Sequence, residues 1–259
     1  MLVRQAANVL DILEYFATHK RVATLAEISR DLGLPRSSAF NLISTLVERG
    51  FLYEPKIRGG FYPTPRWLSL AQEIAGAEPL PEALLDLIKD LAEKTGETVW
   101  IAAPSGQHAV FLEVIESQAS VRYTAEVGTR VPMHATASGQ AIISQLPPSQ
   151  QASILRKAVF IQYGPGTPMS IDAVESSIRQ SLNRGWFVSA SAYSRDLGGI
   201  SLPIVLGERV FAITVAGPWF RVGEKLHDFA REMHRAVALH FGPDYLRKHV
   251  RGLASLDVG

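Results

Sequence analysis

The chain has 259 residues, a formal net charge of +1 at pH 7, 47% hydrophobic and 20% charged residues, which is the balance of a globular protein with room for one large or two ordinary domains. It contains no cysteine, which excludes disulfides and thiolate metal sites. No apolar run approaches the roughly 18 residues of a membrane span, and no secretory signal pattern is visible, so we expect a cytoplasmic protein without a membrane partner.

The first predicted element is a helix over residues 6–18. Apolar residues recur at helical spacing and predict one buried stripe. This helix is expected to cover the two helices that follow. The predicted stripe consists of Val9, Leu10, Leu13, Phe16 and Ala17.

Residues 24–48 predict two helices joined by a tight turn. Thr24 followed by Glu27 three residues later is a capping box, the signature of a helix start. Gly33 ends that helix, because glycine adopts the left-handed conformation at little cost. Pro35 is expected at the first position of the second helix, which needs no N–H donor there. Leu34 is expected to pack inward between the two helices.

The second helix is expected to run to about Glu48 with one apolar face and one polar face. Two short strands, residues 51–53 and 61–62, then flank a turn that contains Lys56 and Arg58. This order predicts a winged helix-turn-helix that places one helix in the DNA major groove. A generic helical hairpin is the alternative. The predicted buried face consists of Ala39, Leu42, Ile43, Leu46 and Val47, and the predicted DNA-contacting residues are Thr24, Arg36, Ser37, Ser38, Phe40, Asn41, Thr45, Lys56, Arg58 and Gly59.

Charge is distributed unevenly along the chain. Residues 1–66 hold nine Lys or Arg and six Asp or Glu, a balance of +3, which leaves −2 for the remainder. The excess places attraction for double-stranded DNA in the N-terminal quarter. Because so few bases bind DNA weakly, we expect a dimer to supply affinity.

Prolines and glycines after the wing predict a domain boundary. A short helix over residues 66–74 is followed by Gly76, Pro79 and Pro81. Because Trp67, Leu68 and Leu70 are too apolar for a free linker, we expect them to pack against a partner subunit or another helix. The predicted divisions are residues 1–65 (DNA-binding domain), 66–80 (linker helix), 81–245 (effector-binding domain) and 246–259 (a frayed tail).

The C-terminal part predicts strands in consecutive groups with helices outside. Such grouping favours an antiparallel α+β domain over a doubly wound nucleotide-binding fold. A hairpin is expected around Gly207 and Glu208. Predicted strands cover 97–104, 109–117, 120–128, 185–191, 200–207 and 208–217, and predicted helices start near 81 and cover 138–144, 149–158, 171–184 and 225–241.

Four segments together carry a family resemblance. Residues 91–117 (LAEKTGETVWIAAPSGQHAVFLEVIES), 128–147 (GTRVPMHATASGQAIISQLP), 184–191 (RGWFVSAS) and 200–218 (ISLPIVLGERVFAITVAGP) resemble the IclR family of bacterial transcriptional regulators in order and spacing. The resemblance implies a winged helix-turn-helix, a linker helix and a C-terminal mixed α/β domain similar to GAF folds. It also implies a small effector, often a carboxylate or aromatic catabolite, and a homodimer or homotetramer on promoter DNA.

By position, the resemblance also implies an effector pocket. Small residues at the start of the helix at 138–144 let a ligand approach, and free N–H groups there favour an anion. A tightly packed Ala/Gly helix is the alternative. The implied residues are Met133, Thr136, Ala137, Ser138, Gly139, Ser189, Ser201 and Thr214.

The chain departs from the family pattern at several of these positions. Relatives often carry Asp where this chain has Ser189 and Ala190, and Glu where it has Ala192. A pocket with fewer acids favours an anionic or aromatic ligand. On the DNA side, Asn41 replaces a basic residue and can pair with adenine.

Two other classes of function compete with this reading. An enzyme fused to a DNA-binding domain is disfavoured, because G-x-S-x-G, P-loop and G-x-G-x-x-G motifs are absent from the sequence. His108 and His134 have no second ligand at a metal spacing, so we expect no catalytic residue, metal or cofactor. A winged-helix module for protein contacts is the other alternative, and the steep salt dependence of DNA binding would distinguish it. The sequence leaves open whether the protein activates or represses.

Overall fold

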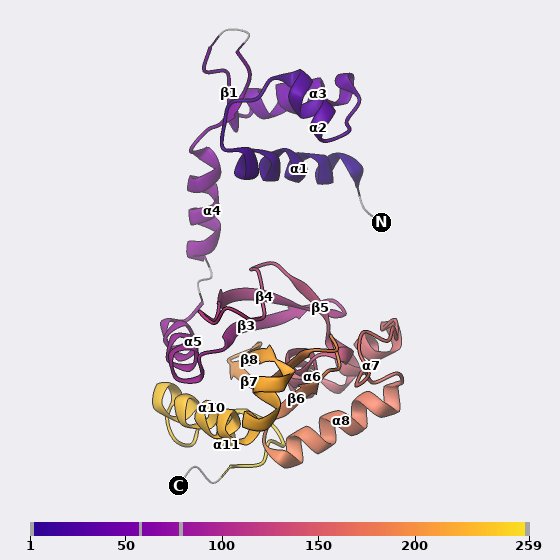
Figure 1. Ribbon diagram of the computed structural model, residues 1–259, viewed down its shortest axis with the longest axis vertical. Coiled ribbons are helices and arrows are strands. Elements are labelled where there is room, and N and C mark those ends of the chain that lie inside the picture. Colours follow the sequence, from indigo (N-terminus) through magenta and orange to yellow (C-terminus); the bar gives the residue numbers. More distant parts are fainter. Residues whose placement is uncertain (1–2, 57–58, 78–79, 257–259) are drawn as a thin grey trace. The chain divides into compact units, whose positions relative to one another are not determined.

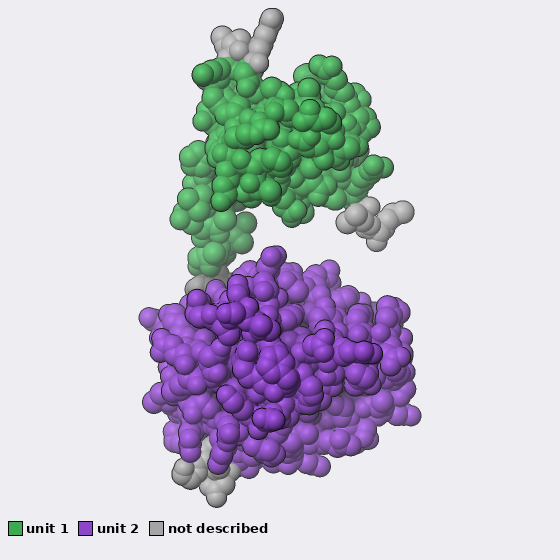
Figure 2. Space-filling model, in the orientation of Figure 1, with its two compact units in different colours: residues 1–79 green, residues 80–259 purple. Residues whose placement is uncertain are grey.

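The computed structural model describes residues 3–56, 59–77 and 80–256. The chain divides into two compact units, residues 1–79 and residues 80–259, each with its own hydrophobic core (Figure 2). The predicted linker helix is α4 (Arg66–Ala77), and it belongs to the first unit.

The first unit is a helix-turn-helix followed by a short hairpin (Figure 1). Its capping box is present: Thr24 N donates to Glu27 Oε2 at 2.8 Å, and Glu27 N donates to Thr24 Oγ1 at 3.3 Å. Gly33 has a φ of 63° and ends the helix as predicted. Pro35 lies at the N-cap, one residue before its predicted position, because its ψ of 137° is extended. The elements are α1 (Arg4–His19), α2 (Leu25–Asp31), α3 (Arg36–Glu48), β1 (Leu52–Tyr53) and β2 (Tyr62–Pro63).

The predicted buried faces of α1 and α3 are wrong in part. In α1, Leu10 is 58% exposed and Ala17 is also exposed, whereas Ile12 and Tyr15 are buried. The buried arc is rotated by about one residue because Ile12, Tyr15 and Phe16, not Leu10, face α2 and α3 in the shared core. In α3, Val47 is exposed.

Trp67 ties the start of α4 to the wing. Its ring packs on Phe51 with centroids 4.3 Å apart, and its Nε1 donates to the Phe51 carbonyl at 2.9 Å. Leu68, Leu70 and Ile74 remain exposed on the same helix. Trp67 therefore packs on the wing and not, as expected, on another helix, and Leu68 and Leu70 have no cover within the described residues of the first unit.

The second unit is built on one six-stranded sheet with the order β5-β4-β3-β8-β7-β6. Every neighbouring pair is antiparallel, which confirms the predicted α+β class. Leu206 pairs with Arg209, so the predicted hairpin around Gly207 and Glu208 is confirmed. The strands are β3 (Thr98–Ser105), β4 (His108–Ile115), β5 (Arg130–Pro132), β6 (Phe187–Ala190), β7 (Leu197–Leu206) and β8 (Arg209–Pro218).

Helices cover both faces of this sheet (Figure 1). Along β3, Val99 and Ile101 enter one core, and Trp100 and Ala102 enter the other, because side chains alternate across a strand. The first core is covered by α5 (Glu82–Thr95), α10 (Leu226–Phe241) and α11 (Tyr245–His249), and the second by α6 (Ala137–Gln145), α7 (Pro148–Lys157) and α8 (Ile171–Arg184). A short α9 (Trp219–Val222) follows β8, and a 3-10 turn, η1 (Met133–Ala135), precedes α6.

Two expectations for the second unit are wrong. Residues 120–128 form no strand; the segment crosses as a loop that is held by contacts such as Thr98 Oγ1 to the Tyr123 carbonyl at 2.6 Å. Residues 245–256 are not frayed. Arg251 N donates to Gln145 Oε1 at 2.8 Å, and Ala254 N donates to the Leu182 carbonyl at 2.8 Å. The tail stays on the domain because it satisfies these buried polar groups.

The capping box gives a test of the first unit. Thr24→Ala removes the side-chain acceptor for the α2 N-terminus and should lower the free energy of unfolding of the helix-turn-helix by about 1 kcal/mol. Hydrogen exchange of α2 and α3 amides in the full chain measures this. Thr18→Ala is the matched control: its hydroxyl bonds only to Glu14 O within α1, and alanine is favoured there. Equal losses in the two variants would contradict the role given to Thr24.

Candidate functional site

Most of the predicted DNA-contacting side chains lie together on the outer face of α3. Ala39, Ile43 and Leu46 hold the opposite face in the core, so the helical period turns the polar face outward. Short polar side chains there allow the backbone to approach base edges closely. The exposed members are Arg36, Ser37, Phe40, Asn41 and Thr45, and Ser38 is half-buried.

The start of α3 adds backbone donors to this face. Pro35 at the N-cap makes no side-chain capping bond. The N–H groups of Arg36, Ser37 and Ser38 have no acceptor one turn earlier in the helix. Free donors at the positive end of a helix can bind a phosphate.

A groove beside α3 brings in residues that the sequence reasoning missed. Arg4, Gln5 and Asn8 of α1 line it together with Ser38 and Asn41 of α3. Their spacing of i, i+1 and i+4 marks a polar face at the start of α1. This polar face can be recognised in the sequence beside the apolar stripe of the same helix. The three side chains add one cation and two amides next to the predicted reading face.

The other predicted DNA contacts lie apart from α3. The Thr24 hydroxyl is occupied by the capping box, donating to Glu27 Oε2 at 2.9 Å. In the wing, Lys56 is exposed, and its carbonyl accepts from Gly59 N at 2.7 Å in the turn. Arg58 lies outside the described residues. The DNA role of these residues stays a prediction.

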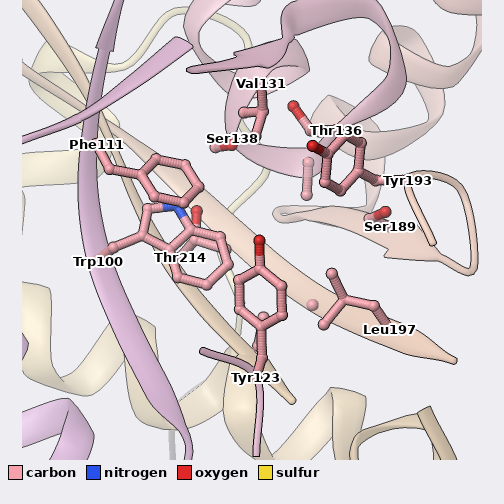
Figure 3. A pocket seen from close by; sticks show the side chains of 13 residues that line it. Trp100, Phe111, Tyr123, Val131, Thr136, Ser138, Ser189, Tyr193, Leu197 and Thr214 are labelled. Atoms are coloured by element: carbon pink, nitrogen blue, oxygen red, sulfur yellow. The ribbon is translucent and has the colours of Figure 1, made fainter. Parts of the chain in front are cut away.

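A cavity lies in the second unit between the sheet and the start of α6, and we call it the α6 cavity (Figure 3). About 350 Å³ in and around it is not filled by protein atoms, and this space includes open solvent. The lining residues are Trp100, Phe111, Tyr123, Val131, Thr136, Ala137, Ser138, Ser189, Tyr193, Leu197, Gly199, Thr214 and Ala216.

The sheet and α6 bring five of the eight predicted effector residues to this lining: Thr136, Ala137, Ser138, Ser189 and Thr214. The other three lie behind it.

Gly139 faces η1 instead of the cavity. A Cβ at this position would come within 2.2 Å of Met133 Cα, and Met133 is itself fully buried. Ser201 is fully buried and does not line the cavity, and it accepts a hydrogen bond from Thr214 Oγ1 at 3.0 Å. These residues therefore support the lining without forming it.

Aromatic side chains make up much of the lining, and the sequence reasoning missed them. Trp100 of β3 stacks on Phe111 of β4 with centroids 4.8 Å apart and lies 5.6 Å from the Tyr123 ring. Tyr193 comes from the loop between β6 and β7. Because β3 is apolar on both faces, its sequence pattern does not show which face carries a site.

The cavity has donors but no charged side chain among its described lining residues. Thr136 caps α6 by accepting from Gly139 N at 3.1 Å, and the N–H groups of Ala137 and Ser138 have no acceptor one turn earlier. The helix dipole adds positive potential at this end.

The two tyrosines of the lining add neutral hydroxyl groups. Burial raises the pKa of Tyr123 to about 12 and also raises the pKa of Tyr193. Both hydroxyls therefore stay protonated at neutral pH, and both point into the cavity (Figure 3). The arrangement suits an apolar ring that carries a negative group.

His134, a candidate considered from the sequence, is not part of a metal cluster. It is buried against Phe160, with ring centroids 5.0 Å apart, and burial lowers its pKa, so the ring is neutral at pH 7. Its Nε2 has no hydrogen-bond partner among the described residues. Within the same residues, no group of three His, Asp or Glu side chains could hold a metal ion.

Family models match both units of the chain. The model for the C-terminal domain of IclR bacterial transcriptional regulators matches residues 76–241, and the IclR helix-turn-helix model matches residues 5–55. Among curated proteins, the chain is 26% identical over 242 residues to the transcriptional repressor AllR of Escherichia coli K12. That match covers 90% of this chain and 89% of AllR.

Solved structures share the fold. The IclR protein of Thermotoga maritima matches with a TM-score of 0.71 and 19% identity, covering 92% of this chain and 99% of that one. An IclR homolog from Microbacterium hydrocarbonoxydans, solved in complex with 4-hydroxybenzoate, matches with a TM-score of 0.66 and 24% identity. It covers 91% of this chain and 99% of that one.

A substitution at Gly139 tests the close packing of α6 on η1, next to the α6 cavity. Gly139→Ala forces a methyl group into the Met133 backbone and should lower the free energy of unfolding of the second unit by about 1–3 kcal/mol. Thermal unfolding of the full chain measures the loss. Gly76→Ala, with nothing within 4 Å of its added methyl group, is the control and should be neutral or stabilising. An unchanged melting temperature in Gly139→Ala would contradict the close packing of α6 on η1.

Proposed function

The chain belongs to the IclR family of bacterial transcriptional regulators, and we propose that its effector is a small aromatic carboxylate bound in the α6 cavity. It is a DNA-binding regulator under the control of a small molecule. The proposal names the class of molecule and the side chains that would hold it.

The composition of the cavity carries this proposal. Trp100 and Phe111 offer flat apolar surface to a ring. At the α6 end, the N–H groups of Ala137 and Ser138, with the protonated Tyr193 hydroxyl, offer donors to a carboxylate. No carboxylate side chain among the described lining residues would repel it.

The comparison with the Microbacterium hydrocarbonoxydans protein supports the same class. That IclR homolog was solved with 4-hydroxybenzoate, a benzene ring with a carboxylate and a hydroxyl group. A molecule of this kind has both features that the α6 cavity can recognise, an apolar ring and a single negative charge.

For the DNA side, we propose that α3 reads promoter DNA in the major groove. The exposed face formed by Arg36, Ser37, Asn41 and Thr45, with Arg4 in the adjacent groove, supports this assignment. A homodimer would present two such helices to successive major grooves. The exposed apolar residues Leu68, Leu70 and Ile74 on α4 support self-association, because exposed apolar patches often mark interfaces.

We also propose that the chain acts by binding alone, without catalysis, in the cytoplasm where bacterial promoter DNA lies. The relative AllR is named as a transcriptional repressor. Among the described residues, no helix is both long enough and apolar enough to cross a bilayer.

Ser38→Ala and Asn41→Ala should each weaken specific operator binding by about tenfold, because each removes a hydrogen-bonding group from the proposed reading face. DNase I footprinting and fluorescence anisotropy on promoter DNA measure the loss. Ser29→Ala is the control, because its hydroxyl is occupied by the Leu34 carbonyl at 2.7 Å in the turn. Operator affinity in wild type should also fall steeply as salt rises. Footprints like wild type in both variants would refute α3 as the reading helix.

Ala137→Leu should abolish effector binding while the chain stays folded and bound to DNA. Ala137 is 3% exposed and lines the cavity at the end where the carboxylate would sit, so a larger side chain occupies the site. The measurement is the rise in melting temperature with benzoate, which wild type should show by mass action and the variant should lose. Equal rises in the two proteins would exclude the α6 cavity as the site.

A further inference from the structure

Three polar side chains form a row across the centre of the sheet, at the floor of the α6 cavity. Trp100 on β3 lies directly opposite Thr214 on β8, and Thr214 lies directly opposite Ser201 on β7. Residues paired in this way project to the same face of a sheet with their Cβ atoms about 5 Å apart. Figure 3 shows Trp100 and Thr214 on one wall of the cavity.

The direction of the hydrogen bonds in this row is fixed by a carbonyl group. Ser201 Oγ lies 2.9 Å from the Ile213 carbonyl oxygen, which can only accept, so the Ser201 hydroxyl donates its one proton there. Thr214 Oγ1 must then donate its proton to Ser201 Oγ at 3.0 Å. The Thr214 proton is engaged in this bond, so the Thr214 oxygen can offer the cavity only its lone pairs, as an acceptor.

The neighbouring Trp100 offers the opposite group. Its indole N–H can only donate, and Nε1 is buried with no hydrogen-bond partner among the described residues. Trp100 as a whole is 5% exposed. A buried donor without a partner costs free energy that a suitable ligand atom would recover.

We propose that Trp100 Nε1 and Thr214 Oγ1 bind a hydroxyl substituent on the ring of the effector. A hydroxyl group accepts one hydrogen bond and donates another, so it satisfies both groups at once. An ammonium group can only donate and an ether can only accept, so each would satisfy only one of them. The inference rests on the proposed aromatic carboxylate and adds its second polar group.

The position of the row in the cavity determines which end of the ligand contacts Trp100 and Thr214. Thr136 at the start of α6 lies on the other side of the cavity from Trp100 and Thr214, next to Tyr193 (Figure 3). With the carboxylate at the α6 end, the hydroxyl belongs on the far side of the ring. Ser201 does not line the cavity and acts as a positioning residue, because it holds the proton of Thr214 away from the ligand.

The test compares 4-hydroxybenzoate with benzoate by isothermal titration of the full chain. Wild type should bind 4-hydroxybenzoate at least about tenfold more tightly, the preference expected when the analogue leaves buried groups unpaired. Thr214→Val keeps the shape and removes the acceptor, and Trp100→Phe keeps the ring and removes the donor. Each variant should reduce the ratio of the affinities for 4-hydroxybenzoate and benzoate towards one. Thr214→Ser restores the hydroxyl and should restore the preference.

Two further variants separate the row from general effects on the cavity. Ser201→Ala releases the Thr214 proton and should lower the preference, with little further loss when combined with Thr214→Val, because the two act through one hydrogen-bond chain. Ser189→Ala removes a hydroxyl from the lining outside the row, so it should change the affinities for both ligands by the same factor and leave their ratio unchanged. Circular dichroism and melting temperature confirm that each variant is folded.

The outcomes separate this inference from the proposed function. Equal affinity of wild type for the two ligands, or an unchanged preference in Thr214→Val, overturns the hydroxyl site and leaves the aromatic carboxylate standing. Binding of neither ligand by the wild type overturns the proposed class and the hydroxyl site together. A preference that is lost in Thr214→Val and kept in Thr214→Ser and Ser189→Ala establishes the site.

Discussion

The close contact between α6 and η1 is the constraint on which the proposed effector site depends. Gly139 allows the helix to approach Met133 more closely than any side chain would permit. Thr136 fixes the helix start, because its hydroxyl accepts from Gly139 N and donates to the Pro132 carbonyl. The N–H groups of Ala137 and Ser138 are thereby held at the cavity wall. The proposed site for an anion thus follows from how one short helix is packed and capped, and it requires no cationic side chain.

The antiparallel sheet supplies the other half of the site. Alternation along β3 sends Val99 and Ile101 into the core under α5 and α10, and it sends Trp100 towards α6. On that face of the sheet, Gly199 has no side chain and Ala216 has only a methyl group. The space above these two residues is therefore not filled by protein atoms. The polar row of Trp100, Thr214 and Ser201 crosses this floor. An aromatic wall and a directed hydrogen-bond chain therefore come from the same strands.

Local signals in the sequence predicted local structure well. The capping box of Thr24 and Glu27, the left-handed Gly33 and the hairpin turn after Leu206 each depend on a few adjacent residues. Features set by tertiary contacts were predicted poorly. The buried arc of α1 is fixed by where α2 and α3 lie, and residues 120–128 became a loop because their polar contacts are with distant groups.

The same difference applies to the candidate site, where some residues were predicted and others were not. The family resemblance pointed to Thr136, Ala137, Ser138, Ser189 and Thr214, which line the cavity. Spacing alone could not reveal the aromatic residues contributed by separate strands and loops.

The measurement that tests the account most directly is operator affinity of the full chain as 4-hydroxybenzoate is titrated. Reciprocal linkage predicts that operator affinity changes over the same concentration range that fills the cavity. Constant operator affinity while the cavity becomes saturated would contradict the account.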